Sequence, residues 1–236
     1  MELSVLTRLR GDIESTLEVL GRAGAITAEA QVPASVLRSY TLEHASVLAE
    51  LGETERAGSL LSRFSQLDSA LAKARLDVLR FTGDSAQPVD YTELQAVLER
   101  SPFVFSIPLA IALARAYLRA DRPELAHDVL AARARWFTRH YPLLPDTLEA
   151  RLTFGWVLHD LDRYDEADLE FRAVRTAHPN AWASAWAAVG SASVARALGR
   201  RVEQTTLSEA HASLLEAPAG WDFERRRATE LVTAAP

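Results

Sequence analysis

Cysteine is missing altogether from the 236-residue sequence. Its absence excludes disulfide bonds, thiolate nucleophiles and zinc or iron–sulfur sites with cysteine ligands. A chain without disulfides suits a reducing compartment. Residues 1–20 carry charges every few positions, where a signal peptide would have an apolar core. We therefore expect a cytoplasmic protein.

Basic charge is scarce as well, since the formal net charge is −6 and Lys73 is the one lysine. Proteins that bind nucleic acid usually carry a basic excess, so nucleic acid is disfavoured as a partner. Long apolar runs are also missing. Residues 101–114 are uncharged but too short to span a bilayer, and residues 176–195 are too polar. No membrane segment is predicted.

Helix breakers are few, because glycine and proline occur only 10 times each while 48% of the residues are hydrophobic. Apolar residues recur at helical spacing along nearly the whole chain, and no segment alternates as a strand does. This pattern predicts an all-α protein. One predicted helix ends at Gly21 and another ends at Gly52. Helices come in pairs joined by short turns, which favours antiparallel neighbours.

The clearest internal repeat lies between Gly155 and Pro179. Gly155 is followed by Leu158, then by Ala167 and Phe171 with three residues between them. This spacing resembles the tetratricopeptide repeat, whose motif runs W-x2-L-G-x2-Y, A-x3-F and P in about 34 residues. The motif's tryptophan position holds arginine here. Other stretches match fewer positions: Ala114, Tyr117, Ala126 and Leu130; Ala45, Leu48, Gly52, Ala57 and Leu61; and Trp186, Val189 and Gly190.

The resemblance implies stacked antiparallel helix hairpins that form a right-handed superhelix, an α-solenoid with a concave and a convex surface. Small residues at the recurring alanine and glycine positions let helices cross closely, and large ones such as Phe171 fill the space between pairs. We expect an N-terminal helical cap over residues 1–36 and about five hairpins over 37–216. A C-terminal capping helix and tail are expected over 217–236. A degenerate hairpin is expected between Ala57 and Ala126.

Acidic residues crowd together between His159 and Glu170. The pattern fails as a calcium loop, because Tyr164 and Asp165 stand where the motif needs an oxygen ligand and a glycine. The solvated side of two helices explains these charges better. No histidine pair has zinc spacing, and no phosphate loop or nucleophile motif occurs in the sequence. We therefore predict no catalytic residue, no metal site and no cofactor.

The concave groove is the remaining candidate site. In tetratricopeptide-like proteins the first helix of each pair lines the inner surface, and the resemblance implies the same here. Arg115 and Arg119 share a helix face, and with Trp156 they could hold a carboxylate and an apolar anchor. The alternative is that both arginines pair with local acids and Trp156 is core. The predicted groove residues are Leu42, Ser46, Glu50, Ile111, Arg115, Leu118, Arg119, Leu152, Trp156, His159 and Asp160.

A second candidate surface is the aromatic and basic segment 133–144. Its composition fits base stacking with phosphate contact, but packing of Trp136 and Phe137 from a long helix is favoured. The three arginines at 225–227 are interpreted as part of a solvated cap.

These features predict a non-enzymatic scaffold that binds a protein or peptide partner in its groove. The alternative hypothesis is a regulatory or ligand-sensing module of a signalling or transcription system, with self-association into a homo-oligomer. A helical enzyme or RNA-binding protein is the third hypothesis, which the missing motifs and the acidic charge disfavour.

Overall fold

The computed structural model describes residues 12–29, 32–62, 91–100, 103–178, 180–217 and 221–233. Within these ranges the chain is helical with short connections and has no β-strand, which confirms the all-α prediction. The helices are α2 (Ile13–Glu29), α3 (Ala34–Glu50), α4 (Thr54–Ser62), α6 (Thr92–Arg100), α7 (Phe103–Arg119), α8 (Pro123–His140), α9 (Pro145–Asp160), α10 (Tyr164–Ala177), α11 (Ala181–Ala197), α12 (Gln204–Leu215) and α13 (Asp222–Thr233).

The same turn closes four of the helices. After α3, α7, α9 and α11, one residue adopts a left-handed conformation, with φ between 55° and 79°. The next amide then donates back to a carbonyl five residues earlier, for example Arg163 N to Leu158 O at 2.8 Å. This is the Schellman arrangement, which satisfies carbonyls at a helix end. The left-handed residues are Gly52, Asp121, Asp162 and Gly199.

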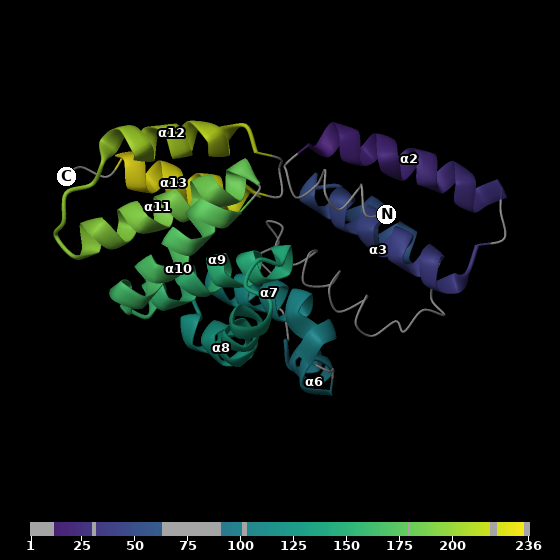
Figure 1. Cartoon of the computed structure of the whole chain (residues 1–236), viewed down its shortest axis with the longest axis horizontal. Helices are drawn as coiled ribbons and strands as arrows, with labels where there is room; N and C mark the ends of the chain where they lie inside the picture. Colours follow the sequence, from purple (N-terminus) through teal and green to yellow (C-terminus); the bar gives the residue numbers. More distant parts are fainter. Residues whose placement is uncertain are drawn as a thin grey trace.

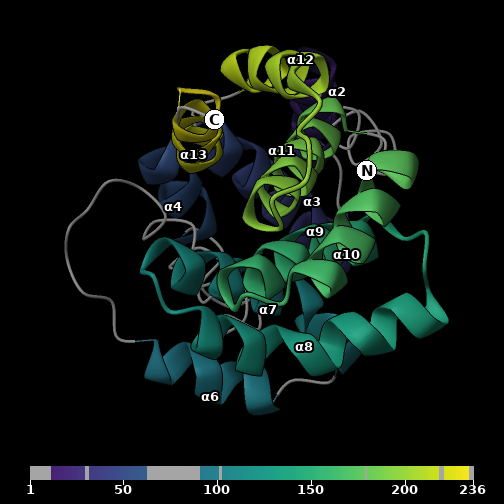
Figure 2. The same cartoon turned by 90° about the vertical axis from the view of Figure 1, so that its left-hand side faces the viewer.

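Neighbouring helices pack in sequence order. α7 packs on α8, α9 on α10 and α11 on α12, while α9 also contacts α7 and α11. In Figure 2, α7, α9 and α11 follow one another from bottom to top, and α8, α10 and α12 follow in the same order. Figure 1 shows α11, α12 and α13 together at one end and α2 beside α3 at the other. A large core extends from Leu94 to Ala228, and α3 and α4 share a smaller one.

Phe171 of α10 fixes the spacing of three helices. Its side chain is fully buried. A Cβ built on Gly155 of α9 would lie 2.7 Å from the ring, and one built on Gly190 of α11 would lie 2.5 Å from it. Both glycines therefore give room to the ring. The other recurring small residues, Ala45, Ala57, Ala114, Ala126 and Ala167, are buried as well.

Some sequence predictions differ from the structure. The prediction that a helix ends at Gly21 is wrong, because α2 continues through Gly21 to Glu29. The expected cap boundary at residue 36 falls in the first turn of α3. The degenerate hairpin falls mostly on residues 63–90, which lie outside the described ranges. Over the described ranges, no helix combines the length and apolar character needed to cross a bilayer.

Candidate functional site

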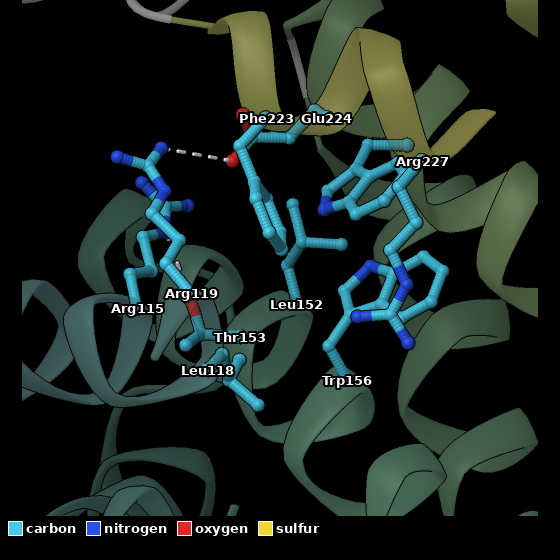
Figure 3. Close-up of a pocket in the computed structure, with 10 residues that line it drawn as sticks. Arg115, Leu118, Arg119, Leu152, Thr153, Trp156, Phe223, Glu224 and Arg227 are labelled. Carbon is cyan, nitrogen blue, oxygen red and sulfur yellow. Dashed lines mark hydrogen bonds and ion pairs between the residues drawn. The ribbon is translucent and has the colours of Figure 1, made fainter. Parts of the chain in front are cut away.

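A groove over α7, α9 and α11 is covered by α13, the last helix of the chain (Figure 3). Ten residues from these four helices enclose what remains of it: Arg115, Leu118, Arg119, Leu152, Thr153, Trp156, Trp186, Phe223, Glu224 and Arg227. The cavity between them has a volume of about 20 Å³. A volume of roughly 10–15 Å³ is needed for one water molecule. With α13 in place, the groove therefore has no room for an organic ligand.

Helical spacing explains how two helices build the groove wall. Arg115, Leu118 and Arg119 lie three or four residues apart in α7, so they share one face. Leu152 and Trp156 are four apart in α9 and do the same. Because α7 and α9 pack against each other, the two faces form one continuous surface.

Arg119 and Glu224 join α7 to α13. Their side chains approach to 3.5 Å, and both are largely buried. Burial lowers the pKa of the Arg119 guanidinium, while the charge of Glu224 opposes this change. The guanidinium carbon of Arg119 also lies 5.3 Å from the centre of the Phe223 ring, within the range of a cation–π contact. Figure 3 shows Phe223 and Glu224 reaching from α13 toward Arg119.

Arg227 joins α13 to the end of α9. Its guanidinium carbon lies 4.3 Å from the Trp156 ring centre, and its Nη1 donates to Asp160 Oδ2 at 3.0 Å. His159 completes the contact, with Nδ1 2.8 Å from Asp160 Oδ1 and Nε2 2.7 Å from Ser193 Oγ of α11. Burial opposes ionisation of Asp160, but hydrogen bonds from His159 and Arg227, together with the Arg227 charge, lower its pKa overall.

Arg115 is held by its own neighbours. It pairs with Glu149 of α9, and its Nε donates to Thr153 Oγ1 at 3.1 Å. His178 Nε2 lies 3.1 Å from the other oxygen of Glu149. Burial would raise the pKa of Glu149, but the Arg115 charge and the His178 contact outweigh it and lower that pKa to about 2. Glu149 therefore stays ionised and fixes Arg115 at the groove edge.

Trp156 belongs to the core as much as to the groove. Its side chain is only 2% exposed, and it stacks on Trp186 with ring centres 4.1 Å apart. Its Nε1 is buried and has no hydrogen-bond partner among the described residues; the same holds for Oε2 of Glu224. These two atoms are the unsatisfied polar groups of the groove lining.

The structure brings most of the predicted groove residues together. Five of them line the cavity: Arg115, Leu118, Arg119, Leu152 and Trp156. His159 and Asp160 meet the groove through Arg227. Ile111 does not line the cavity, because it is buried in the core at 7% exposure. Leu42, Ser46 and Glu50 belong to α3, and their side chains lie outside the described ones.

Sequence reasoning missed the α13 side of the groove. The interpretation of residues 225–227 as a solvated cap is wrong for Arg227, whose side chain is 23% exposed and bound to Asp160. Glu224, Arg227, Ala228 and Leu231 are three or four residues apart, which places them on one helix face. That spacing was the available signal. Thr153 and Trp186 were missed because nothing local distinguishes them from core residues.

The segment 133–144 packs as the favoured interpretation predicted. α8 runs to His140, Phe137 is buried, and Trp136 packs partly buried against the core. Trp136 stacks on His140, with ring centres 4.5 Å apart. A second, open pocket of about 210 Å³ lies beside this helix. Its lining combines Phe154 and Ala134 with three polar side chains of α8 and one acid of α10: Arg135, Thr138, Arg139 and Glu170.

The acidic segment 159–170 has structural partners. Asp162 occupies the left-handed turn position, Asp168 pairs with Arg172, and Glu170 pairs with Arg151 at 2.6 Å. In the part of the chain that the structure describes, no three histidine, aspartate or glutamate side chains gather as metal ligands would.

The groove offers charges and aromatic faces for holding a helix, arranged around a buried tryptophan stack.

Comparison with known proteins found no matching family model, no similar curated protein and no similar solved structure.

Proposed function

We propose that this chain is a non-enzymatic interaction scaffold whose groove over α7, α9 and α11 binds a protein or peptide partner. The observation that carries the proposal is the docking of α13 in that groove. Side chains 105 positions apart in sequence meet there, since Arg119 pairs with Glu224. A surface that holds a helix by charge and aromatic contact has the features of a protein-binding groove.

We also propose that the helix pairs form a tetratricopeptide-like, right-handed superhelix. Two observations support this arrangement. The turn with a left-handed residue recurs after α3, α7, α9 and α11. Packing of α9 against both α7 and α11 is typical of arrays in which each hairpin buries its apolar face on the next.

Affinity capture with charge reversal at Arg119 tests the scaffold function. The full chain and its Arg119→Glu variant are used to capture partners from native lysate, followed by cross-linking to map the contact. We expect Arg119→Glu to lose partners that cross-link to α7 or α9. Arg122→Glu is the matched control, because Arg122 is exposed in the next turn. Equal capture by both variants, with unchanged circular dichroism, would refute a groove function. Trp156→Ala is unsuitable, because removing a buried tryptophan costs about 3–5 kcal/mol of stability.

Ligand sensing is the second candidate function, and the pocket beside α8 favours it. Arg135 and Arg139 are one helical turn apart at the pocket, and Phe154 and Ala134 supply apolar wall. This combination suits an anionic ligand with an apolar body. We expect dodecanoate to raise the melting temperature of the full chain, and the shift to keep rising with the logarithm of dodecanoate concentration once the site is saturated. The shift should disappear in Arg135→Ala/Arg139→Ala; a shift that persists in this variant would place the ligand elsewhere.

A further inference from the structure

The α13 residues that enter the groove form a short pattern. Phe223 and Glu224 are adjacent, and Arg227 follows three residues after Glu224, so all three reach the same side of the helix. Each meets a different feature of the groove wall. Phe223 and Glu224 face Arg119, and Arg227 covers Trp156 and binds Asp160. The groove wall therefore contacts an aromatic ring, a carboxylate and a guanidinium of α13 in a fixed order.

Polar contacts dominate the docking of α13. Six of its twelve residues, DFERRRATELVT, are charged. Ala228 is its one fully buried apolar side chain among those described, while Phe223, Leu231 and Val232 are only partly buried. α13 packs mainly on α12 and α11, so its contact with the α7 and α9 wall rests on the three side chains Phe223, Glu224 and Arg227. A partner helix with the same three side chains would reproduce those contacts.

The docked helix also leaves groove atoms unsatisfied. Trp156 is 2% exposed and Glu224 is 7% exposed, yet Trp156 Nε1 and Glu224 Oε2 have no hydrogen-bond partner in the described part of the chain. Both residues line the same cavity. A partner helix with an acceptor beside Trp156 Nε1 would make a hydrogen bond that α13 does not make.

We infer that the groove recognises a partner helix that presents an aromatic residue, a carboxylate next to it and an arginine one turn later. In the free chain, α13 carries this pattern and occupies the groove. The partner helix must therefore displace α13 to bind. The inference rests on the proposed function, since it names the partner of the same groove. Helix-in-groove binding is a common mode of peptide recognition.

Competition with α13 sets the affinity that a partner needs. A segment of the same chain acts at an effective concentration on the order of millimolar. The apparent affinity of an outside helix is reduced by the fraction of chains whose groove is covered. Weakening α13 inside the chain should therefore strengthen binding of an added helix, whereas the same change in the added helix should weaken it.

Calorimetric titration of the full chain with a synthetic peptide of residues 221–233 tests these two opposite effects. A substitution in the chain should strengthen peptide binding, and the same substitution in the peptide should weaken it. We expect the Arg227→Ala chain to bind the unmodified peptide at least about tenfold more tightly than the wild-type chain does. Against that same Arg227→Ala chain, the Arg227→Ala peptide should bind at least about tenfold more weakly than the unmodified peptide. Equal affinities in either comparison would overturn the inference.

Glu230→Ala is the control, because it removes a charge from an exposed position of α13 that does not line the cavity. In chain or peptide, it should change the affinity less than about twofold, as expected for a screened surface charge. Circular dichroism establishes that each variant chain is folded.

A charge exchange keeps the inference testable if Arg227→Ala disturbs folding. The Arg119→Glu chain should bind the Glu224→Arg peptide at least about tenfold more tightly than the unmodified peptide, because the ion pair is restored with its signs reversed. Equal binding of the two peptides would overturn the inference.

Sedimentation of the wild-type chain tests whether a second copy of the chain, and not a separate partner, occupies the groove. A concentration-dependent dimer that the peptide dissociates would show that α13 of a second copy occupies the groove. That result would overturn recognition of a separate partner.

The experiments also distinguish failure of the inference from failure of the proposed function. If Arg119→Glu loses captured partners but no variant chain binds the peptide, the inference falls and the proposed function stands. If the peptide binds as expected but Arg119→Glu captures every partner, the proposed function falls.

Discussion

Phe171 and the two glycines that face it show how one ring can set the distance between helices. Closely packed cores resist added volume, and inserting a methyl group costs about 1–3 kcal/mol when the surrounding atoms cannot move. Phe171 is fully buried between α9 and α11, so its ring has little space into which it could shift away from an added Cβ. The stability of this region therefore depends on the absence of a single methyl group at each glycine.

Gly190→Ala should lower the free energy of unfolding by about 1–3 kcal/mol, because its Cβ would lie 2.5 Å from the Phe171 ring. Gly21→Ala is the matched control. Gly21 also lies within a helix, but nothing stands within 4 Å of its added Cβ, so this change should stabilise by up to about 1 kcal/mol. Urea denaturation of both variants measures the difference. Equal effects would show that the ring does not constrain Gly190.

At the scale of elements, Glu149 connects three helices. Glu149 lies in α9 and pairs with Arg115 of α7. Its other carboxylate oxygen contacts His178, which follows the last residue of α10. Arg115 and His178 together hold the Glu149 carboxylate in its ionised form. The packing of α7 against α9 near the groove therefore depends on a charge that acid removes.

Acid should weaken the fold through Glu149. Its pKa falls from 4.5 to about 2 on folding, so its contribution is fully present above pH 4.5 and is lost as the pH falls toward 2. One pKa unit corresponds to about 1.4 kcal/mol, so the loss amounts to roughly 3 kcal/mol. The Glu149→Gln variant should be less stable at neutral pH, and its stability should fall less between pH 4.5 and 2. Urea denaturation across this range measures both. Parallel pH profiles would contradict the assignment.

The element scale also explains the errors of the sequence predictions. Gly21 was predicted to end a helix, but a glycine in a helix costs only about 1 kcal/mol, and α2 continues past it. Ile111 shares a helix face with Arg115, one turn away, so the resemblance to a repeat placed both in the groove. Burial of an isoleucine gains about 1.5–3 kcal/mol, and the core covers this end of the face.

At the scale of the whole molecule, local spacing was enough for the helical class, and the resemblance to a repeat added the α7 and α9 side of the groove. Arg115, Arg119, Leu152 and Trp156 follow from helical periodicity together with the resemblance to a repeat. The α13 side could not be obtained in this way. Arg119 and Glu224 are 105 positions apart, and no local pattern states which distant helix will cover a given face. A charged segment such as 222–233 looks solvated until its partner surface is known.

The stacked indoles of Trp156 and Trp186 lie next to Arg227, so their fluorescence should report whether α13 is in place. Their rings stack at 4.1 Å, and the guanidinium lies 4.3 Å above one of them. Indole emission responds to nearby cations and to water, so departure of α13 would alter the light emitted by this pair without any added dye. Occupancy of the groove can then be followed as a change in the total emission of the five tryptophans, in an unlabelled protein and on the timescale of mixing.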